Sequence, residues 1–407
     1  MNKKKISELV IFSYISYLLI IGLLLQPFNV LFDGLYKILT SPGMLITDYM
    51  VVGGVGPALV NASLVGLIGL FLIKLNSVPI TGPSIASIFI MVGFGLFGKN
   101  IWSILPIFLG VYIYSKIKKQ RFRTYIYPAL FGTALAPIVS QTVFGFGLGL
   151  GGGILLGTIA GMILPPLSSH LLKTHEGFNL YNVGFTCGFT GLLLYNILRG
   201  CGFTSEIVVL WGTEFDSLIR LIIIPMSVSM ITLGFLLNKR SFKGYKEIFK
   251  YPGVLITDYT AIAGFSNTLV NMGLVGLIGI LYIELVNGSY NGPTLGALLT
   301  IIGFGAFGKN PKNIPPIMMG VFLGTLLSTH EANGAGPLLA ALFGTCLAPL
   351  AGKFGPLIGM LAGFCHLSVV SYVGGLYGGL NLYNNGFAAG IVATIFIAII
   401  QGLKRDV

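Results

Sequence analysis

Charge is scarce in this chain of 407 residues, in which Asp, Glu, Lys and Arg make up 9%. An ordinary soluble domain has roughly a quarter of its residues charged. So few charges cannot form a surface solvated by water, which excludes a soluble globular protein. Hydrophobic residues make up 55% and form long runs. Because hydrocarbon satisfies no free backbone amide or carbonyl, runs of about 20 apolar residues predict transmembrane helices.

Cysteine is also rare, and its positions indicate no metal site. Four cysteines have no short paired spacing, so we expect neither a disulfide framework nor a metal centre. They are Cys187, Cys201, Cys346 and Cys365. The sequence has no His-Glu-x-x-His motif and no nucleotide-binding loop. We therefore expect no catalytic centre, no cofactor and no enzyme activity.

Basic residues exceed acidic ones, 24 to 12, and give a formal net charge of +12. In a soluble protein this excess would suggest nucleic acid. Here the basic residues cluster in short loops between apolar runs, where they act as topology signals. We expect the bilayer and a small-molecule solute as partners and no nucleic acid, and we leave a homo-oligomer open.

The chain contains an internal duplication. Residues 41–100 align without a gap onto 251–310, and about 28 of the 60 positions are identical. The matched motifs are Leu-Ile-Thr-Asp-Tyr, Leu-Val-Gly-Leu-Ile-Gly, Gly-Phe-Gly-x-Phe-Gly-Lys-Asn, Phe-Gly-Thr-x-Leu-Ala-Pro and Asn-Leu-Tyr-Asn. We predict two repeats, residues 1–205 and 206–407, that form one membrane domain.

Each repeat contains seven apolar runs. In the first they are roughly 8–27, 48–75, 80–98, 101–117, 125–143, 146–166 and 180–198. In the second they are roughly 217–238, 258–285, 290–308, 313–328, 335–352, 354–372 and 383–402. An odd number of crossings inverts the second repeat. The fold class expected is therefore an all-α integral membrane protein with about 14 transmembrane segments in two inverted seven-segment repeats.

The distribution of basic residues supports this inversion. Residues 116–123 are strongly basic, and their counterpart 326–333 has no Lys or Arg. With both termini in the cytoplasm, about 20 of the 24 Lys and Arg lie on the cytoplasmic side of the cell membrane. The third runs, 80–98 and 290–308, are short and can re-enter instead of spanning. Re-entry of these runs alone would change the parity.

Two long runs carry polar residues that are candidates for a binding site. Asn61 and Asn271 lie in runs of about 28 residues with internal helix breakers. A helix unwound near the bilayer centre would let this two-fold related pair meet around a polar solute. The alternative is that each asparagine forms an interhelical hydrogen bond that only packs helices.

Helix starts supply a second set of candidates. Gly82-Pro83 and Gly292-Pro293 suit the first turn of a helix, whose free amides attract anions. The alternative is an ordinary helix start at the interface. Asp48 and Asp258 precede the long second runs and either cap them or couple transport to an ion. Lys99 and Lys309 end the third runs, where a cation complements a helix C-terminus.

The Asn-Leu-Tyr-Asn motif opens the last run of each repeat. Its side chains combine amide donors, amide acceptors and a phenol that can replace a hydration shell. The candidates are Asn179, Asn182, Asn381 and Asn384. Helix capping and an interfacial aromatic belt explain them equally well.

The duplicated motifs Leu-Ile-Thr-Asp-Tyr, Gly-Phe-Gly-x-Phe-Gly-Lys-Asn and Asn-Leu-Tyr-Asn resemble those of an uncharacterised bacterial membrane-protein family, domain of unknown function 1576. The resemblance covers nearly the whole chain and implies a class without a mechanism. The seven-plus-seven plan also resembles the nucleobase and sulfate transporter fold, and some stretches are loosely similar to urea channels. These two likenesses concern the fold alone.

We expect a transporter that moves a small polar or anionic solute by alternating access, with its site between the repeats. A passive channel for a small uncharged solute is the alternative. A membrane-embedded enzyme acting on a lipid-linked substrate is the third candidate.

Overall fold

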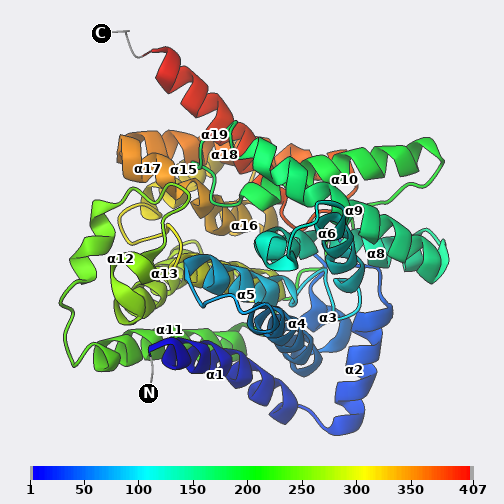
Figure 1. Ribbon diagram of the computed structural model, residues 1–407, viewed down its shortest axis with the longest axis horizontal. Helices are drawn as coiled ribbons and strands as arrows, with labels where there is room; N and C mark the ends of the chain where they lie inside the picture. Colours follow the sequence, from blue (N-terminus) through cyan, green and yellow to red (C-terminus); the bar gives the residue numbers. More distant parts are fainter. Residues whose placement is uncertain (1–2, 404–407) are drawn as a thin grey trace.

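The computed structural model describes residues 3–403, and this part of the chain is helical with no β-strand (Figure 1). The first repeat contains α1 (Lys3–Leu24), α2 (Phe28–Thr40), α3 (Tyr49–Gly53), α4 (Val55–Leu75), α5 (Gly82–Phe94), α6 (Leu105–Ile117), α7 (Ile126–Gly132), α8 (Ala136–Ser140), α9 (Gly149–Leu171) and α10 (Asn182–Gly200). The second contains α11 (Asp216–Leu237), α12 (Tyr259–Ile262), α13 (Gly264–Leu285), α14 (Gly292–Phe304), α15 (Pro315–Leu326), α16 (Ala335–Gly344), α17 (Ala348–Phe354), α18 (Pro356–Val373) and α19 (Asn384–Gly402).

Long apolar helices make this a multi-pass membrane protein. Among the described residues, nine helical segments are long and apolar enough to cross a membrane, and four further apolar helices are shorter. The shorter ones are α5, α6, α14 and α15. The chain ends, residues 1–2 and 404–407, lie outside the described residues, so the cytoplasmic termini stay a prediction.

The second run of each repeat is broken, as its glycines predict. Gly54, with φ of +95°, separates the short helix α3 from α4, and Gly264, with φ of +79°, does the same between α12 and α13. Only glycine adopts such a φ without strain. Both breaks come one short helix after the start of the run. Asn61 and Asn271 therefore lie within regular helix, two turns beyond the break, and not on an unwound turn.

The third and fourth runs of each repeat form a hairpin of short helices. α5 and α6 have 13 residues each, which is about 20 Å of helix against about 30 Å of hydrocarbon. The segment before α5 and the end of α6 line one pocket, with Ser77 on one side and Lys116 on the other. The α5–α6 hairpin therefore returns to the end of the bundle from which it starts.

Helices α5 and α14 cross the middle of the molecule side by side and antiparallel. A Cβ added to Gly82 would come within 2.5 Å of the carbonyl oxygen of Ala306, and one added to Gly292 within 2.8 Å of that of Leu96. In between, Gly93 and Gly296 lie against each other's backbone, at 2.5 Å by the same measure. Glycine lets the two helices approach this closely. Gly82 corresponds to Gly292 in the duplication, and Leu96 corresponds to Ala306. The same contact therefore occurs twice with the repeats exchanged, so the helix pair is two-fold symmetric.

The fifth run of each repeat is also interrupted, which its apolar pattern does not predict. Tight 3₁₀ turns at Thr133–Leu135 and Thr345–Leu347 separate α7 from α8 and α16 from α17. Pro137 and Pro349 come two residues after these turns. Proline lacks the amide that would continue the ladder of helical hydrogen bonds.

Candidate functional site

Asn61 and Asn271 each hold the C-terminal end of a central helix. The Asn61 amide nitrogen donates to the carbonyl oxygens of Gly95 and Lys99 at 2.7 and 3.1 Å. The Asn271 amide makes the equivalent two bonds in the second repeat at 2.6 and 2.8 Å. Because α5 and α14 are antiparallel, these ends lie about one helix length apart, about 20 Å. The structure therefore does not bring the pair together around one solute, and its geometry is that of the packing alternative.

The Gly-Pro helix starts receive a carboxylate from the opposite repeat. The Gly82 amide, which opens α5, donates to Asp258 Oδ1 at 3.0 Å. The start of α14 lies against the carboxylate of Asp48 in the same way, since a Cβ added to Gly292 would come within 2.4 Å of Asp48 Oδ1. Pro83 and Pro293 occupy the next position, where proline costs no hydrogen bond. The anion at each helix start is thus a side chain of the protein itself.

Asp48 and Asp258 cap two helices each. Besides its bond across the repeats, Asp48 accepts from the Met50 amide at 2.9 Å and so caps α3. Asp258 accepts from the Thr260 amide at the same distance and caps α12. These bonds match the capping alternative, and ion coupling by either carboxylate stays a prediction.

The amides of the Asn-Leu-Tyr-Asn motifs mostly bond within the protein. Asn179 donates to the Gly386 carbonyl of the other repeat at 3.0 Å, and Asn182 bonds His175 Nε2 at 3.0 Å. Asn384 donates to the Val370 carbonyl at 3.2 Å. The fourth, Asn381, uses its side-chain oxygen to hold the Tyr383 amide at 3.0 Å, while its buried Nδ2 has no partner among the described residues.

These motifs pack onto the interrupted helices of the opposite repeat. The Leu180 amide donates to the Cys346 carbonyl at 3.0 Å, and the Leu382 amide donates to the Ala134 carbonyl at 3.1 Å. Both acceptors lie in the 3₁₀ turns before the prolines. The two bonds are related by the duplication, and they carry Tyr181 and Tyr383 into the centre of the molecule.

Two buried lysines lie at this junction. Lys309 Nζ donates to the hydroxyls of Tyr181 and Thr345, both at 2.7 Å, so its ligands come from both repeats. Lys99 Nζ donates to the Thr133 hydroxyl at 2.9 Å. Both lysine side chains are at most 1% exposed. We call Lys99, Lys309, Thr133, Thr345, Tyr181 and Tyr383 the paired-lysine cluster. Its two lysines follow opposite ends of the antiparallel α5–α14 pair and do not contact each other, and the rings of Tyr181 and Tyr383 lie between them.

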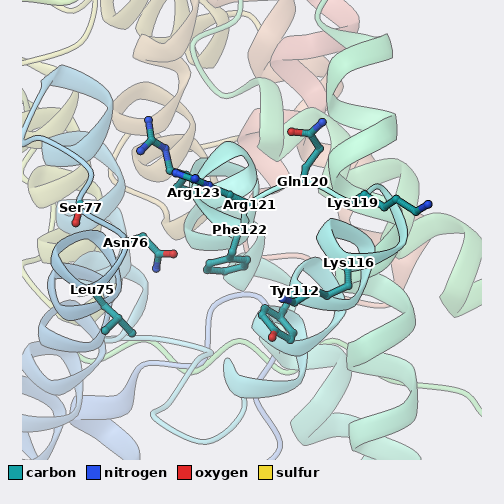
Figure 2. Close-up of a pocket in the computed structure, with 10 residues that line it drawn as sticks. All are labelled: Leu75, Asn76, Ser77, Tyr112, Lys116, Lys119, Gln120, Arg121, Phe122 and Arg123. Atoms are coloured by element: carbon teal, nitrogen blue, oxygen red, sulfur yellow. The ribbon is translucent and has the colours of Figure 1, made fainter.

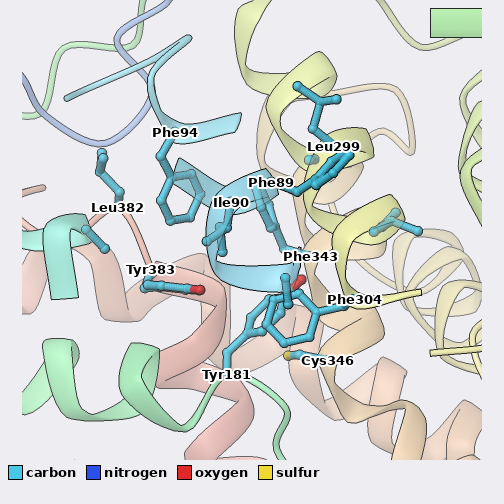
Figure 3. Packing of buried hydrophobic residues seen from close by; sticks show 14 of the residues in the cluster. Phe89, Ile90, Phe94, Tyr181, Leu299, Phe304, Phe343, Cys346, Leu382 and Tyr383 are labelled. Atoms are coloured by element: carbon cyan, nitrogen blue, oxygen red, sulfur yellow. The ribbon is translucent and has the colours of Figure 1, made fainter. Parts of the chain in front are cut away.

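Aromatic rings enclose the paired-lysine cluster with the same two-fold symmetry. The Lys99 ammonium lies 5.5 Å from the ring centre of Phe94, and the Lys309 ammonium 5.3 Å from that of Phe304. The rings of Tyr181 and Tyr383 are 5.3 Å apart. Figure 3 shows Tyr181 and Phe304 gathered together in this core, with Cys346 beside them. Ring faces attract a cation, but they do not replace a counter-ion.

The lysines of the cluster have no carboxylate partner. The ion pairs formed within the described residues join Arg220 to Asp216 and Glu284, and Lys250 to Glu247. An ammonium has three donors, of which Lys99 uses one and Lys309 uses two for the bonds given above. Burying an ammonium without an anion is costly in free energy. Each buried lysine is therefore either neutral or stabilised by a group that accepts its hydrogen bonds.

Sequence reasoning missed the cluster because it assigned Lys99 and Lys309 to helix C-termini. Their ammonium groups instead reach hydroxyls on other helices. A usable signal was present: Lys, Thr and Tyr are each identical in both copies of three separate duplicated motifs. Within the described residues, no group of three or more His, Cys, Asp or Glu side chains is placed to hold a metal ion.

One protein family matches this chain over two stretches, one in each repeat. Residues 28–200 and 237–402 match the family described as "Protein of unknown function (DUF1576)". Comparison with curated proteins found no match, and comparison with solved structures found none. The matched stretches include every residue of the paired-lysine cluster. The chain is therefore a multi-pass membrane protein of the DUF1576 family.

Proposed function

We propose that this protein transports a small polar or anionic solute across the cell membrane by alternating access, with the paired-lysine cluster as its binding site. The observation that carries the proposal is the pair of buried lysines without a carboxylate partner in the described chain. Their spare donors favour an anion among the solutes considered. The proposal is transport and not catalysis.

The location of the cluster between the repeats supports alternating access. Lys309 binds Tyr181 of the first repeat and Thr345 of the second, so any sliding of one repeat against the other changes this site. Inverted repeats that rock about a central site expose it to one side at a time. The antiparallel contact of α5 with α14 is the geometry that an inverted duplication would give.

The short hairpins do not weaken the proposed inversion. The α5–α6 hairpin returns to its starting end, so it adds either two crossings or none. The rest of the repeat would contribute an odd number in both cases. We therefore keep two inverted repeats, 1–205 and 206–407, with both termini in the cytoplasm, as part of the proposal.

Flux into proteoliposomes tests this function. We expect uptake of at least one small anion, from a panel of halides, sulfate, phosphate and short carboxylates, that saturates and is stimulated by the same anion on the opposite side. Lys99→Met and Lys309→Met should abolish it, while Lys353→Met, at an exposed lysine, should leave it intact. Flux that rises linearly without saturation would indicate a passive channel for the solute instead. No flux of any panel member by folded protein would contradict the proposal.

A further inference from the structure

A second candidate site, which shares no residue with the paired-lysine cluster, is a pocket of about 650 Å³ (Figure 2). It lies where α4 ends, α6 ends and the chain turns towards α7. The residues that line it are Leu75, Asn76, Ser77, Tyr112, Lys116, Lys119, Gln120, Arg121, Phe122 and Arg123. Four of these side chains are cationic and none is acidic.

The cations of this basic pocket have no anionic partner in the described chain. Lys116 lies over the ring of Tyr112 at 5.1 Å, and no ion pair involves Lys119, Arg121 or Arg123. All four cationic side chains are exposed. Repulsion among like charges at close range has to be offset by solvent or by a bound anion.

Helix dipoles do not account for the two arginines. Lys116 lies in the last turn of α6, where a cation is favourable. Arg121 and Arg123 instead stand at the N-terminal start of the next helical segment, a 3₁₀ turn at Phe122–Tyr125 that leads into α7. A cation is unfavourable at a helix N-terminus. Cytoplasmic topology accounts for basic residues in this loop, but not for their position around one pocket.

A basic loop on the cytoplasmic side does not need to form a pocket. The basic loop at 238–250 has the same sign of charge, but there Lys250 is paired with Glu247 at 2.8 Å. The repeat counterpart of the pocket loop, residues 326–333, has no Lys or Arg. Lys239 and Arg240 of the loop at 238–250 form no ion pair within the described residues, so this loop provides a matched control for loss of charge.

We propose that the basic pocket binds a phosphate group, that of an anionic membrane phospholipid. Arginine matches the geometry of phosphate oxygens with paired N–H donors, and lysine adds a point charge. The lining includes exposed apolar side chains, Leu75 at 65% and Tyr112 at 45% exposure, beside the cations. Apolar surface next to a cationic recess suits a lipid, whose acyl chains and headgroup need both. A soluble phosphate compound needs only the recess.

Thermal unfolding of the purified protein with dioctanoyl phosphatidylglycerol tests this inference. We expect the lipid to raise the Tm of wild type, and Arg121→Gln/Arg123→Gln to weaken its apparent Kd about tenfold or more, because charge-assisted hydrogen bonds are lost. Lys239→Gln/Arg240→Gln removes two charges from the other basic loop and should leave Kd unchanged. Arg121→Lys/Arg123→Lys keeps the charge and should bind with intermediate strength.

Three results would overturn the inference. The first is an unchanged Kd in Arg121→Gln/Arg123→Gln, provided that its Tm without lipid equals that of wild type. The second is an equal loss in Lys239→Gln/Arg240→Gln, which would mean general attraction to charge. The third is equal stabilisation by glycerol 3-phosphate at the same concentration, which would assign the pocket to a soluble phosphate compound and not to a lipid.

Discussion

At the scale of single residues, the central observation is that the paired-lysine cluster buries two lysine side chains, which costs stability. Each ammonium is surrounded by hydroxyls and rings and lacks a carboxylate in the described chain. A side chain retained only for packing would be apolar at this depth. This is the observation on which the proposed binding role of the lysines rests.

Replacing one of these lysines should separate the two roles. Lys309→Met keeps the length of the side chain and removes its buried charge, so we expect the Tm to stay the same or rise. Transport should be lost in the same variant. Thermal unfolding and proteoliposome flux measured on one preparation check both expectations. A loss of about 3–5 kcal/mol in the free energy of unfolding, as when a buried ion pair is broken, would make the lysine structural.

At the scale of helices, the two central glycines fix how closely the repeats approach. An added methyl group at Gly93 would meet the Gly296 backbone at 2.5 Å, and no flexible side chain can move out of its way. We expect Gly93→Ala to destabilise the protein by about 1–3 kcal/mol through overpacking. Gly151→Ala, in α9 with nothing within 4 Å, is the matched control and should be neutral or slightly stabilising. Equal Tm values for the two variants would contradict the close contact.

The reciprocal caps make a second prediction at this scale. Asp48→Asn keeps an acceptor for the Met50 amide but loses the charge that faces the start of α14. We expect a loss of about 0.5–2 kcal/mol of stability and an unchanged dependence of transport on proton or sodium gradients. Flux measured with imposed gradients checks this. If the variant transports but no longer responds to a gradient, Asp48 couples an ion and is more than a cap.

The helices show what sequence alone can predict. Apolar runs located the long helices, and glycines located the break before α4. They missed α2, which lies between the first two runs. The break at Thr133 was not predicted, because the apolar pattern of the fifth run continues through Pro137 without interruption. The site escaped for a different reason: Lys309 meets Tyr181 at a distance of 128 residues along the chain, and no local pattern reports such a contact.

At the scale of the whole molecule, the account requires two repeats of opposite orientation. The duplication, the two-fold pairing of α5 with α14 and the exchange of Asp48 and Asp258 between repeats all agree with it. Single cysteines introduced in the basic loop at 116–123 and in its counterpart at 326–333 should therefore react with impermeant thiol reagents from opposite sides of the membrane. Labelling of both loops from one side would remove the inverted arrangement.

The most direct test of the central claim uses the thiols that already lie beside the lysines. Cys187 and Cys346 are fully buried, whereas Cys201 is exposed and Cys365 is partly so. In a Cys201→Ser/Cys365→Ser variant, a small anionic thiol reagent should modify Cys346 in the folded protein when added from either side of the membrane. The transported anion should slow this reaction. If Cys346 reacts only after unfolding, while uptake by the same preparation is intact, the solute does not pass through the paired-lysine cluster and the account is wrong.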